Sequence, residues 1–196
     1  MDFGCGSKPY KSLFKVDEYV GVDYNGEGHS HENEQIDVFY DGVKLPFADN
    51  HFDSVFSTEV FEHVFNLEQI VPEIKRVMKP GAKILVTCPF AIPEHEQPND
   101  YARYSSFGLK HLFEKNGFRV TDFEKIGNHF DALIQLRISF YSLVIFPKLN
   151  KIKFLKYFFQ AIVYMFFNLY ALAFGGLFKR KTALYLNNVI VCEKLN

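Results

Sequence analysis

The chain has 196 residues and a formal net charge of -1, and 48% of its residues are hydrophobic. This length and composition allow one domain with a full apolar core and exclude a disordered chain. The balanced charge argues against a general nucleic-acid binder, so no nucleic-acid partner is expected. Cys5, Cys88 and Cys192 are too few and too scattered for a disulfide framework, which favours a reducing, cytoplasmic location.

The first predicted element is a glycine turn between a strand and a helix, over residues 2–10. Gly4 and Gly6 permit positive φ angles and a close approach of the main chain to a ligand. Pro9 suits the first turn of a helix, which we expect over Tyr10–Lys15. Such a turn directs free N–H groups at an anionic or polar ligand. Cys5 has no neighbouring base in the sequence, so a small packing residue is favoured over a nucleophile.

Polar residues end three successive predicted strands. Val20–Asp23 ends in an acid about 20 residues after the glycines, where nucleotide-binding α/β folds place a carboxylate for the ribose hydroxyls. Ile36–Tyr40 is followed by Asp41, and Phe52–Ser57 is followed by Thr58 and Glu59. Because parallel strands bind ligands at their carboxyl ends, these residues predict a binding edge of a parallel sheet.

The middle of the chain alternates helices and strands. Helices are predicted over Glu59–Phe65 and Leu67–Met78, with Lys79-Pro80-Gly81 ending the second. Lys83–Cys88 is an apolar strand suited to burial on both faces. A loop with three prolines, a helix capped by Ser105 or Ser106 that runs to Lys115, and a strand over Phe118–Ile126 follow.

Five motifs in this order resemble class I S-adenosylmethionine-dependent methyltransferases, of the methyltransferase type 11 kind. They are D-F-G-C-G from Asp2, G-V-D from Gly21, D-G-V-K-L-P-F-A-D-N-H-F-D from Asp41, E-V-F-E-H-V from Glu59 and V-M-K-P-G-A-K-I-L-V from Val77. The chain is similar in particular to small methyltransferases of bacterial cell-surface glycan clusters, through H-E-Q-P-N-D-Y-A-R-Y at His95–Tyr104.

The resemblance implies a Rossmann-like, doubly wound α/β fold with a mostly parallel sheet and an antiparallel last strand. It places a central strand before Asp2, where only Met1 stands, so we expect the first strand to be largely missing from an N-terminally truncated chain. A central parallel strand is buried on both faces, and its loss would expose apolar surface. Lys8 stands where the family has the third glycine of its turn, which places a bulky cation near the expected path of the cofactor.

The resemblance also implies S-adenosylmethionine as the cofactor and methyl transfer to a small molecule, a sugar or a lipid-linked glycan. His63 is the candidate general base because imidazole titrates near neutrality, and His95 is the second candidate. Either histidine could instead have a structural role. Arg103 and Tyr104 could hold an anionic or sugar-bearing acceptor, although Arg103 could equally pair with Asp100. The implied cofactor-binding residues are Asp2, Gly4, Cys5, Gly6, Asp23, Asp41, Gly42, Ser57, Thr58 and Glu59.

The composition changes at residue 132. Residues 132–146 are apolar apart from Arg137, and Tyr157–Phe178 carries no charge over a length that could span a bilayer. Lysines flank both ends, and Leu184–Cys192 is a predicted strand that returns to the sheet. A single span would separate this strand from the sheet, so we expect a helical hairpin or interfacial helices on the inner membrane face. A buried helix or a homodimer interface is the alternative.

The expected organisation is a cofactor-binding core over 1–131, an apolar helical insertion over 132–182 and the returning strand over 183–196. His29, His31 and Glu32 suggest a metal site, but no further ligand stands at a recognisable spacing, so a solvated loop is favoured and no metal is expected. Two other functions are open: a binding or regulatory module that keeps the fold without turnover, and an NAD-dependent oxidoreductase. The second is disfavoured because no hydride-transfer residues are evident.

Overall fold

The computed structural model describes residues 1–26, 34–178 and 183–196. The chain divides into two compact units, which we describe separately. The first contains residues 1–88, 95–124 and 188–196, and the second contains residues 89–94 and 125–187. The strands are β1 (Asp2–Phe3), β2 (Gly21–Tyr24), β3 (Val38–Tyr40), β4 (Phe52–Thr58), β5 (Met78–Pro89), β6 (Phe118–Ile126) and β7 (Asn187–Lys194).

Within the described residues, four α-helices and five short helical turns lie between the strands. The α-helices are α1 (Leu67–Val77), α2 (Ser106–Lys115), α3 (His129–Phe140) and α4 (Lys153–Phe174). The short turns are η1 (Lys11–Leu13), η2 (Phe61–His63), η3 (Tyr141–Ile145), η4 (Phe146–Leu149) and η5 (Gly175–Leu177).

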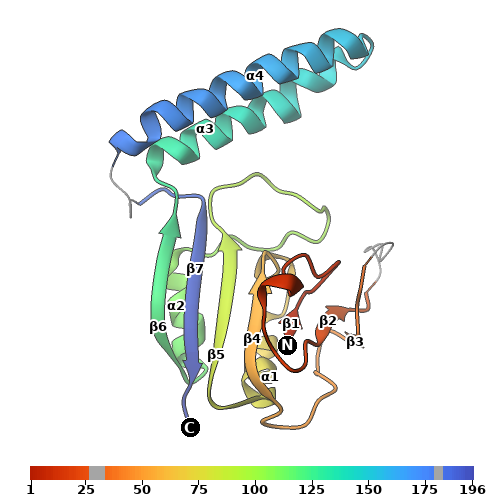
Figure 1. The fold of residues 1–196 in the computed structure, drawn as a ribbon, viewed down its shortest axis with the longest axis vertical. Helices are drawn as coiled ribbons and strands as arrows, with labels where there is room; N and C mark the ends of the chain where they lie inside the picture. The colour runs from red at the N-terminus through yellow and green to blue at the C-terminus, as the bar shows by residue number, and fades with distance from the viewer. Residues whose placement is uncertain (27–33, 179–182) are drawn as a thin grey trace. The chain divides into compact units, whose positions relative to one another are not determined.

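The strands form one seven-stranded sheet in the order β3-β2-β1-β4-β5-β7-β6 (Figure 1). The pairs β1–β2, β1–β4, β2–β3 and β4–β5 are parallel, and β7 runs opposite to its neighbours β5 and β6 (Figure 1). The order reverses at β1, which contributes only two residues. The predicted fold class is therefore confirmed, with a mostly parallel sheet and an antiparallel last strand, and the first strand, expected to be largely missing, is the two-residue β1.

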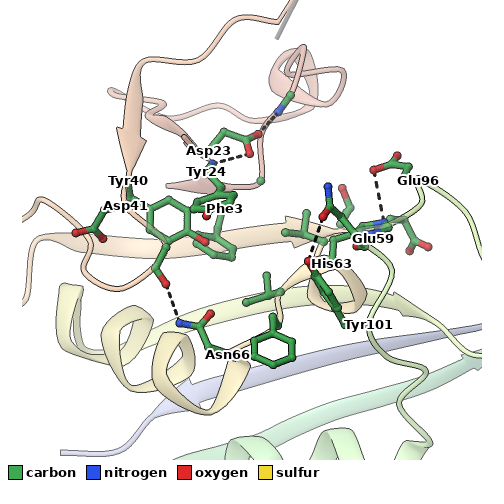
Figure 2. Close-up of a pocket in the computed structure, with 18 of the residues that line it drawn as sticks. Phe3, Asp23, Tyr24, Tyr40, Asp41, Glu59, His63, Asn66, Glu96 and Tyr101 are labelled. Atoms are coloured by element: carbon green, nitrogen blue, oxygen red, sulfur yellow. Dashed lines mark hydrogen bonds and ion pairs between the residues drawn. The ribbon is translucent and has the colours of Figure 1, made fainter. Parts of the chain in front are cut away.

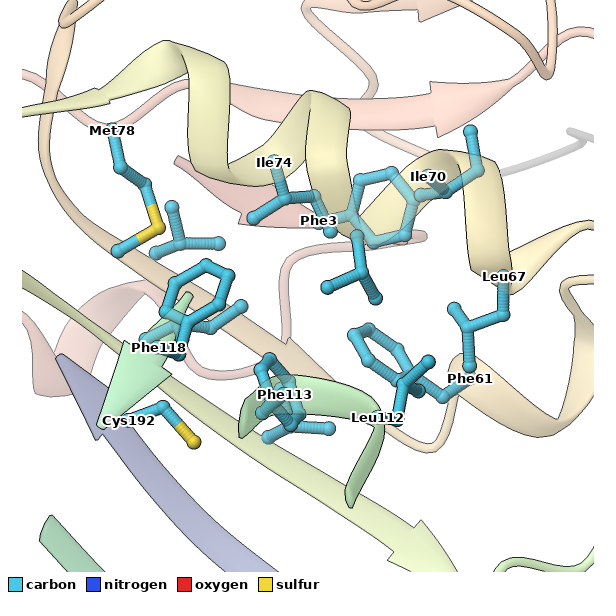
Figure 3. Packing of buried hydrophobic residues seen from close by; sticks show 14 of the residues in the cluster. Phe3, Phe61, Leu67, Ile70, Ile74, Met78, Leu112, Phe113, Phe118 and Cys192 are labelled. Carbon is cyan, nitrogen blue, oxygen red and sulfur yellow. The ribbon is translucent and has the colours of Figure 1, made fainter. Parts of the chain in front are cut away.

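Helices α1 and α2 pack the core against one face of the sheet (Figure 3). In α1 the apolar residues recur at helical spacing, and those facing the sheet are fully buried. Helix α2 adds Leu109, Leu112 and Phe113, and Phe113 stacks on Phe61 with ring centroids 5.9 Å apart. On the other face of β4, Phe56 contacts Tyr10 and Phe14 beside η1. Because successive strand residues point to opposite faces, β4 supports a layer on each side of the sheet.

Two of the helices predicted from the sequence are single turns. The helix expected over Tyr10–Lys15 is the three-residue turn η1, and the one expected over Glu59–Phe65 is η2. Glu59 has a positive φ of 53° and Val64 is extended, so a continuous helix cannot form there. The helix predicted over Leu67–Met78 is α1, which ends one residue earlier at Val77, and the strand predicted over Phe118–Ile126 is β6 with the same bounds.

The second unit contains a helical hairpin made of α3, η3, η4 and α4. A capping box opens α3: the Asn128 side chain accepts from the N–H of Asp131, and the Asp131 carboxylate accepts from the N–H of Asn128. Between the helices, Tyr141 packs near Phe159 and Phe167, and the Ser142 and Tyr164 hydroxyls lie 2.9 Å apart. His129–Leu149 and Lys153–Leu177 are each long and apolar enough to cross a membrane.

Candidate active site

The glycine turn after β1 is fixed by its contacts with neighbouring strands. Gly4 and Gly6 have φ values of 73° and 45°, which favour glycine. A Cβ atom at Gly4 would lie 2.3 Å from the Val60 side chain, so no larger residue fits there. The Gly6 N–H donates to Oδ2 of Asp23 at 2.9 Å. The turn is thereby joined directly to the acid that ends β2.

Lys8 points away from the turn's ligand-facing side. Its side chain is buried and passes beside Gly21, and its Nζ pairs with Asp37 Oδ2 at 2.5 Å. The same carboxylate oxygen accepts the Gly21 N–H at 2.6 Å. Lys8 therefore does not line the cavity described below. The expectation that it stands near the cofactor's path is wrong, because the ion pair draws it toward β2 and β3.

A cavity of about 480 Å³ opens at the carboxyl ends of β1, β2, β3 and β4 (Figure 2). This size is typical of small-molecule and cofactor sites. It lies wholly within the first unit, and its walls combine aromatic rings with several carboxylates. The lining residues are Phe3, Gly4, Gly6, Asp23, Tyr24, Glu34, Tyr40, Asp41, Gly42, Val43, Thr58, Glu59, Val60, His63, Val64, Phe65, Asn66, Glu96, Asn99 and Tyr101.

The three carboxylates predicted at strand ends meet in this cavity. Asp23 accepts main-chain N–H groups at both oxygens, from Gly6 at 2.9 Å and from Tyr24 at 2.8 Å. Asp41 accepts from the N–H groups of Val43 and Lys44, and these bonds hold the pKa of its carboxyl below the usual value. These contacts orient both carboxylates and leave lone pairs for a ligand.

Glu59 is the third of these carboxylates, and its backbone is strained. It combines the positive φ of 53° with a main-chain bond from its N–H to the Thr87 carbonyl at 3.1 Å. The Thr87 hydroxyl donates to Glu59 Oε1 at 2.6 Å. A left-handed conformation in a glutamate costs on the order of 1–3 kcal/mol and persists only where its surroundings impose it. Such strain is concentrated at ligand sites.

Of the ten predicted cofactor residues, Asp2, Cys5 and Ser57 lie behind the lining. The Asp2 carboxylate is buried and accepts from the Tyr19 hydroxyl at 2.5 Å; burial raises its pKa. Burial raises the pKa of the Cys5 thiol to about 12, and Ser57 donates to the Phe3 carbonyl at 2.9 Å. These three residues contact the walls rather than the cavity. Gly4, Gly6, Asp23, Asp41, Gly42, Thr58 and Glu59 line it.

The two predicted histidines lie together, with ring centroids 4.8 Å apart. His63 lines the cavity, and its Nδ1 is 2.7 Å from the Asn99 carbonyl oxygen. Because a carbonyl only accepts, the neutral ring carries its proton on Nδ1 and presents an unprotonated Nε2. His95 lies beside His63 but outside the lining. The structure brings the two candidate bases to one place and gives only His63 a place on the cavity wall.

A fully buried carboxylate, Glu62, lies against both histidines. Its Oε1 is 3.7 Å from His63 Nε2 and 3.8 Å from His95 Nε2. Burial raises the pKa of Glu62 to about 8. Within the described residues, Oε1 has no hydrogen-bond partner. Glu62, His63 and His95 together form the group of side chains that could hold a metal ion. The loop residues His29, His31 and Glu32, for which no metal is expected from the sequence, lie outside the described residues.

Arg103 and Tyr104, the predicted acceptor residues, hold the loop before α2. Two Arg103 nitrogens bind Asp100, each at 2.5 Å, and this contact lowers the pKa of Asp100 to about 2. Tyr104 is half-buried against the core, and its carbonyl accepts from the Asn188 amide at 2.9 Å. Neither residue lines the cavity. Of the two roles considered for Arg103, the structure displays the pairing with Asp100.

Sequence reasoning missed the aromatic walls and Glu62. Phe3, Tyr24 and Tyr40 stand at strand ends, beside residues that were predicted to bind the ligand. Their position in the sequence could therefore have predicted that they line the cavity. Asn66 donates to the Gly42 carbonyl at 2.8 Å, a contact between distant segments that no local pattern reveals. Glu62 alternates with apolar residues and would be placed on a solvent face by periodicity alone.

Comparisons with known proteins point to the same methyltransferase resemblance that the sequence motifs carry. A family model described as a methyltransferase domain matches residues 1–86. Sterol 24-C-methyltransferase ERG6B of Gibberella zeae is 33% identical over 96 residues, which cover 41% of this chain and 25% of that protein. O-methyltransferase rstn1 of Aspergillus nomiae is 28% identical over 153 residues, covering 64% and 66%. The chain thus spans less than two thirds of the length of these relatives.

Among solved structures, phosphoethanolamine N-methyltransferase 2 of Haemonchus contortus in complex with S-adenosyl-L-methionine has a TM-score of 0.56 and 17% identity. The match covers all of this chain and 48% of that one, and it shows a shared fold. The glycine turn, the acid ending β2 and the strand-end cavity fit the cofactor that this fold binds. The match to the methyltransferase domain thus covers residues 1–86, and these similarities support S-adenosylmethionine as the cofactor.

Proposed function

We propose that the protein transfers the methyl group of S-adenosylmethionine to an oxygen or nitrogen of a sugar, a lipid-linked glycan or another small acceptor. The observation that carries the proposal is the cavity, which collects three strand-end carboxylates, a glycine turn and a histidine nitrogen in one place. S-adenosylmethionine supplies an already electrophilic methyl group. The protein therefore has to bind and orient the cofactor and the acceptor, and to exclude water from them. The relatives' names span C-, O- and N-methyltransferases, so they leave the acceptor open.

In this proposal, Asp23 accepts hydrogen bonds from the ribose hydroxyls. Its two oxygens are already held by main-chain N–H groups, so no rotamer freedom is lost when a ligand binds. Asp41 and Gly42 lie on the adenine side, and Thr58 and Glu59 on the methionine side. A hydrogen bond to a charged group contributes about 1.5–3 kcal/mol, so Asp23 should dominate nucleoside affinity.

His63 is the proposed general base for a hydroxyl acceptor. Its Nδ1–H donates to the Asn99 carbonyl. This hydrogen bond fixes the tautomer and also orients the ring, so that Nε2 is free to accept a proton. His95 remains the second candidate, acting beside His63. Neither residue is needed if the acceptor is an amine that is already unprotonated.

The apolar hairpin supports a lipid-bearing acceptor. Most side chains of α4 are exposed, with Val163 its buried residue, and a helix without a polar face requires an apolar environment. Lys148, Lys151 and Lys153 are exposed at the turn between the helices. A charged turn is costly to bury in hydrocarbon, so the hairpin should either lie in the interface or cross fully to the opposite headgroups.

The acceptor is tested with labelled S-adenosylmethionine and extracted lipid-linked glycans, with water-soluble sugars in parallel. Label that enters the organic phase supports a lipid-linked acceptor. Label that enters only the aqueous phase would show that the acceptor is a free sugar. Binding of S-adenosylhomocysteine without transfer to either fraction would instead favour a cofactor-binding or regulatory module. The cytoplasmic membrane location is tested by flotation with anionic vesicles, which should carry the full chain to the top of the gradient.

A further inference from the structure

Three side chains from two segments converge at the edge of the cavity. Glu62 and His63 belong to η2, whereas His95 lies in the loop after β5. Their nearest nitrogen and oxygen atoms all lie within 4.8 Å of one another. Two imidazoles and one carboxylate arranged in this way form a common donor set for divalent transition metals.

Glu62 is the reason to regard this cluster as a binding site rather than as packing. Its side chain is 0% exposed, and its Oε1 has no hydrogen-bond partner in the described part of the chain. Buried polar atoms are nearly always satisfied, and an orphaned one indicates a missing water, ion or ligand. The orphaned oxygen is the atom that faces both histidine Nε2 atoms, at 3.7 Å and 3.8 Å.

His63 has the outer contact that metal ligands usually make, and His95 has a carboxylate beside its other ring nitrogen. His63 Nδ1–H donates to the Asn99 carbonyl, which leaves Nε2 as a lone-pair donor. His95 Nδ1 lies 3.4 Å from Asp100 Oδ2 and 3.3 Å from Arg103 Nη2. Ligation through Nε2 requires the His95 proton to lie on Nδ1 and to point at Asp100. Metal-bound histidines usually make such a contact with a carbonyl or carboxylate at the other nitrogen. The nearby Arg103 charge is offset by its two bonds to Asp100.

We propose that Glu62 Oε1, His63 Nε2 and His95 Nε2 bind one divalent first-row transition metal ion, such as Zn²⁺ or Mn²⁺. Four-coordinate bonds of about 2.0–2.1 Å place neighbouring ligand atoms about 3.3–3.5 Å apart. The two distances measured from Oε1 need to contract by only a few tenths of an ångström. Imidazole nitrogens disfavour Mg²⁺ and Ca²⁺, which prefer oxygen ligands.

The site has an open side toward the cavity. His63 and Glu96 both line the cavity, and Glu96 Oε2 is 3.7 Å from His63 Nε2 (Figure 2). Glu96 is exposed and is free to become a fourth ligand or to yield the position to an acceptor oxygen. A divalent ion there would lower the pKa of a coordinated hydroxyl. It would then replace His63 as the group that activates a hydroxyl acceptor.

The test measures metal binding directly on the full chain without cofactor. After dialysis against chelator, calorimetry with Zn²⁺ and visible absorption with Co²⁺ should give one site per chain. His63→Ala and His95→Ala should each weaken Zn²⁺ binding about tenfold or more and reduce the Co²⁺ bands. His111→Ala is the matched control, because His111 is exposed on α2 away from these residues. A variant with both His29→Ala and His31→Ala should retain the site.

Glu62→Gln separates ligation from folding. It keeps the size of the side chain, so circular dichroism should stay unchanged while Zn²⁺ affinity falls. The proposal is overturned if the wild-type chain binds no metal, if binding survives both single histidine changes, or if the His29 and His31 variant abolishes it. Affinity for S-adenosylhomocysteine, measured on the His95→Ala and Glu62→Gln variants, whose side chains do not line the cavity, should change little, so a failed metal site and a failed methyltransferase assignment give different results.

Discussion

Helices α1 and α4 are both rich in apolar residues but differ in where those residues lie. In α1 the apolar residues occupy one stripe, and Ile70 and Ile74 are fully buried (Figure 3), as is Val77. In α4 they occur on all sides, and Phe154, Met165 and Leu172 are exposed. A stripe specifies one buried face, whereas a helix that is apolar all round needs a surrounding apolar medium. The apolar stripe of α1 is buried by the packing of the core unit, whereas the apolar side chains of α4 stay exposed, which supports the proposal that a lipid surface or a second copy covers the hairpin.

The strongest test of this difference is to make the same leucine-to-alanine substitution in the core unit and in the hairpin. Leu109 of α2 is 0% exposed and Leu172 of α4 is 83% exposed. Leu109→Ala should lower the free energy of unfolding by about 2–5 kcal/mol, because it leaves a cavity in the core. Leu172→Ala should change it by about 0.5 kcal/mol or less. Urea unfolding followed by circular dichroism measures both, and equal losses would show that α4 is packed as a core helix.

The cavity is tested by replacing the acid that ends β2. Asp23→Ala removes an acceptor that both main-chain groups and the proposed ribose contacts use, and S-adenosylhomocysteine affinity should fall at least about a hundredfold. Asp17→Ala is the matched control, since Asp17 is exposed in the loop before β2. Titration calorimetry gives both values. Unchanged affinity in Asp23→Ala would place the nucleoside elsewhere.

The sequence predicts the sheet and the strand-end acids because both follow from local patterns. The position of Asp23 follows from its spacing after the glycines, and α1 follows from its apolar stripe. The direction of the Lys8 side chain could not be predicted, since it depends on Asp37 in the distant segment before β3. The convergence of Glu62 with His95 is likewise a product of the tertiary fold, which brings the loop after β5 onto η2.

The exposed lysines at the hairpin turn sharpen the membrane interpretation. Each lysine near an anionic surface contributes about 1 kcal/mol, so Lys151→Ala with Lys153→Ala should weaken binding to phosphatidylserine vesicles about thirtyfold. The same double change at the exposed Lys11 and Lys15 of the core unit is the control. Vesicle sedimentation at low and high salt measures the effect, which salt should diminish. Equal loss in both variants would mean that attraction is not confined to the hairpin.

The smallest expected effect concerns the ion pair between Lys8 and Asp37, which joins the glycine turn to the segment before β3. Burial opposes ionisation of Asp37, but the Gly21 N–H and the Lys8 ammonium outweigh it and hold its pKa below the usual value. A lowered pKa stabilises the fold above the unfolded-state pKa of about 3.9 and loses that contribution as pH falls through the folded-state pKa. Asp37→Asn should therefore cost on the order of 1 kcal/mol or less at pH 7, because the carboxylate is half-exposed and screened by solvent. Urea unfolding of both proteins should show this gap closing below about pH 4. A gap that stays constant down to pH 3 would mean that the buried Lys8 side chain is held by packing rather than by the carboxylate.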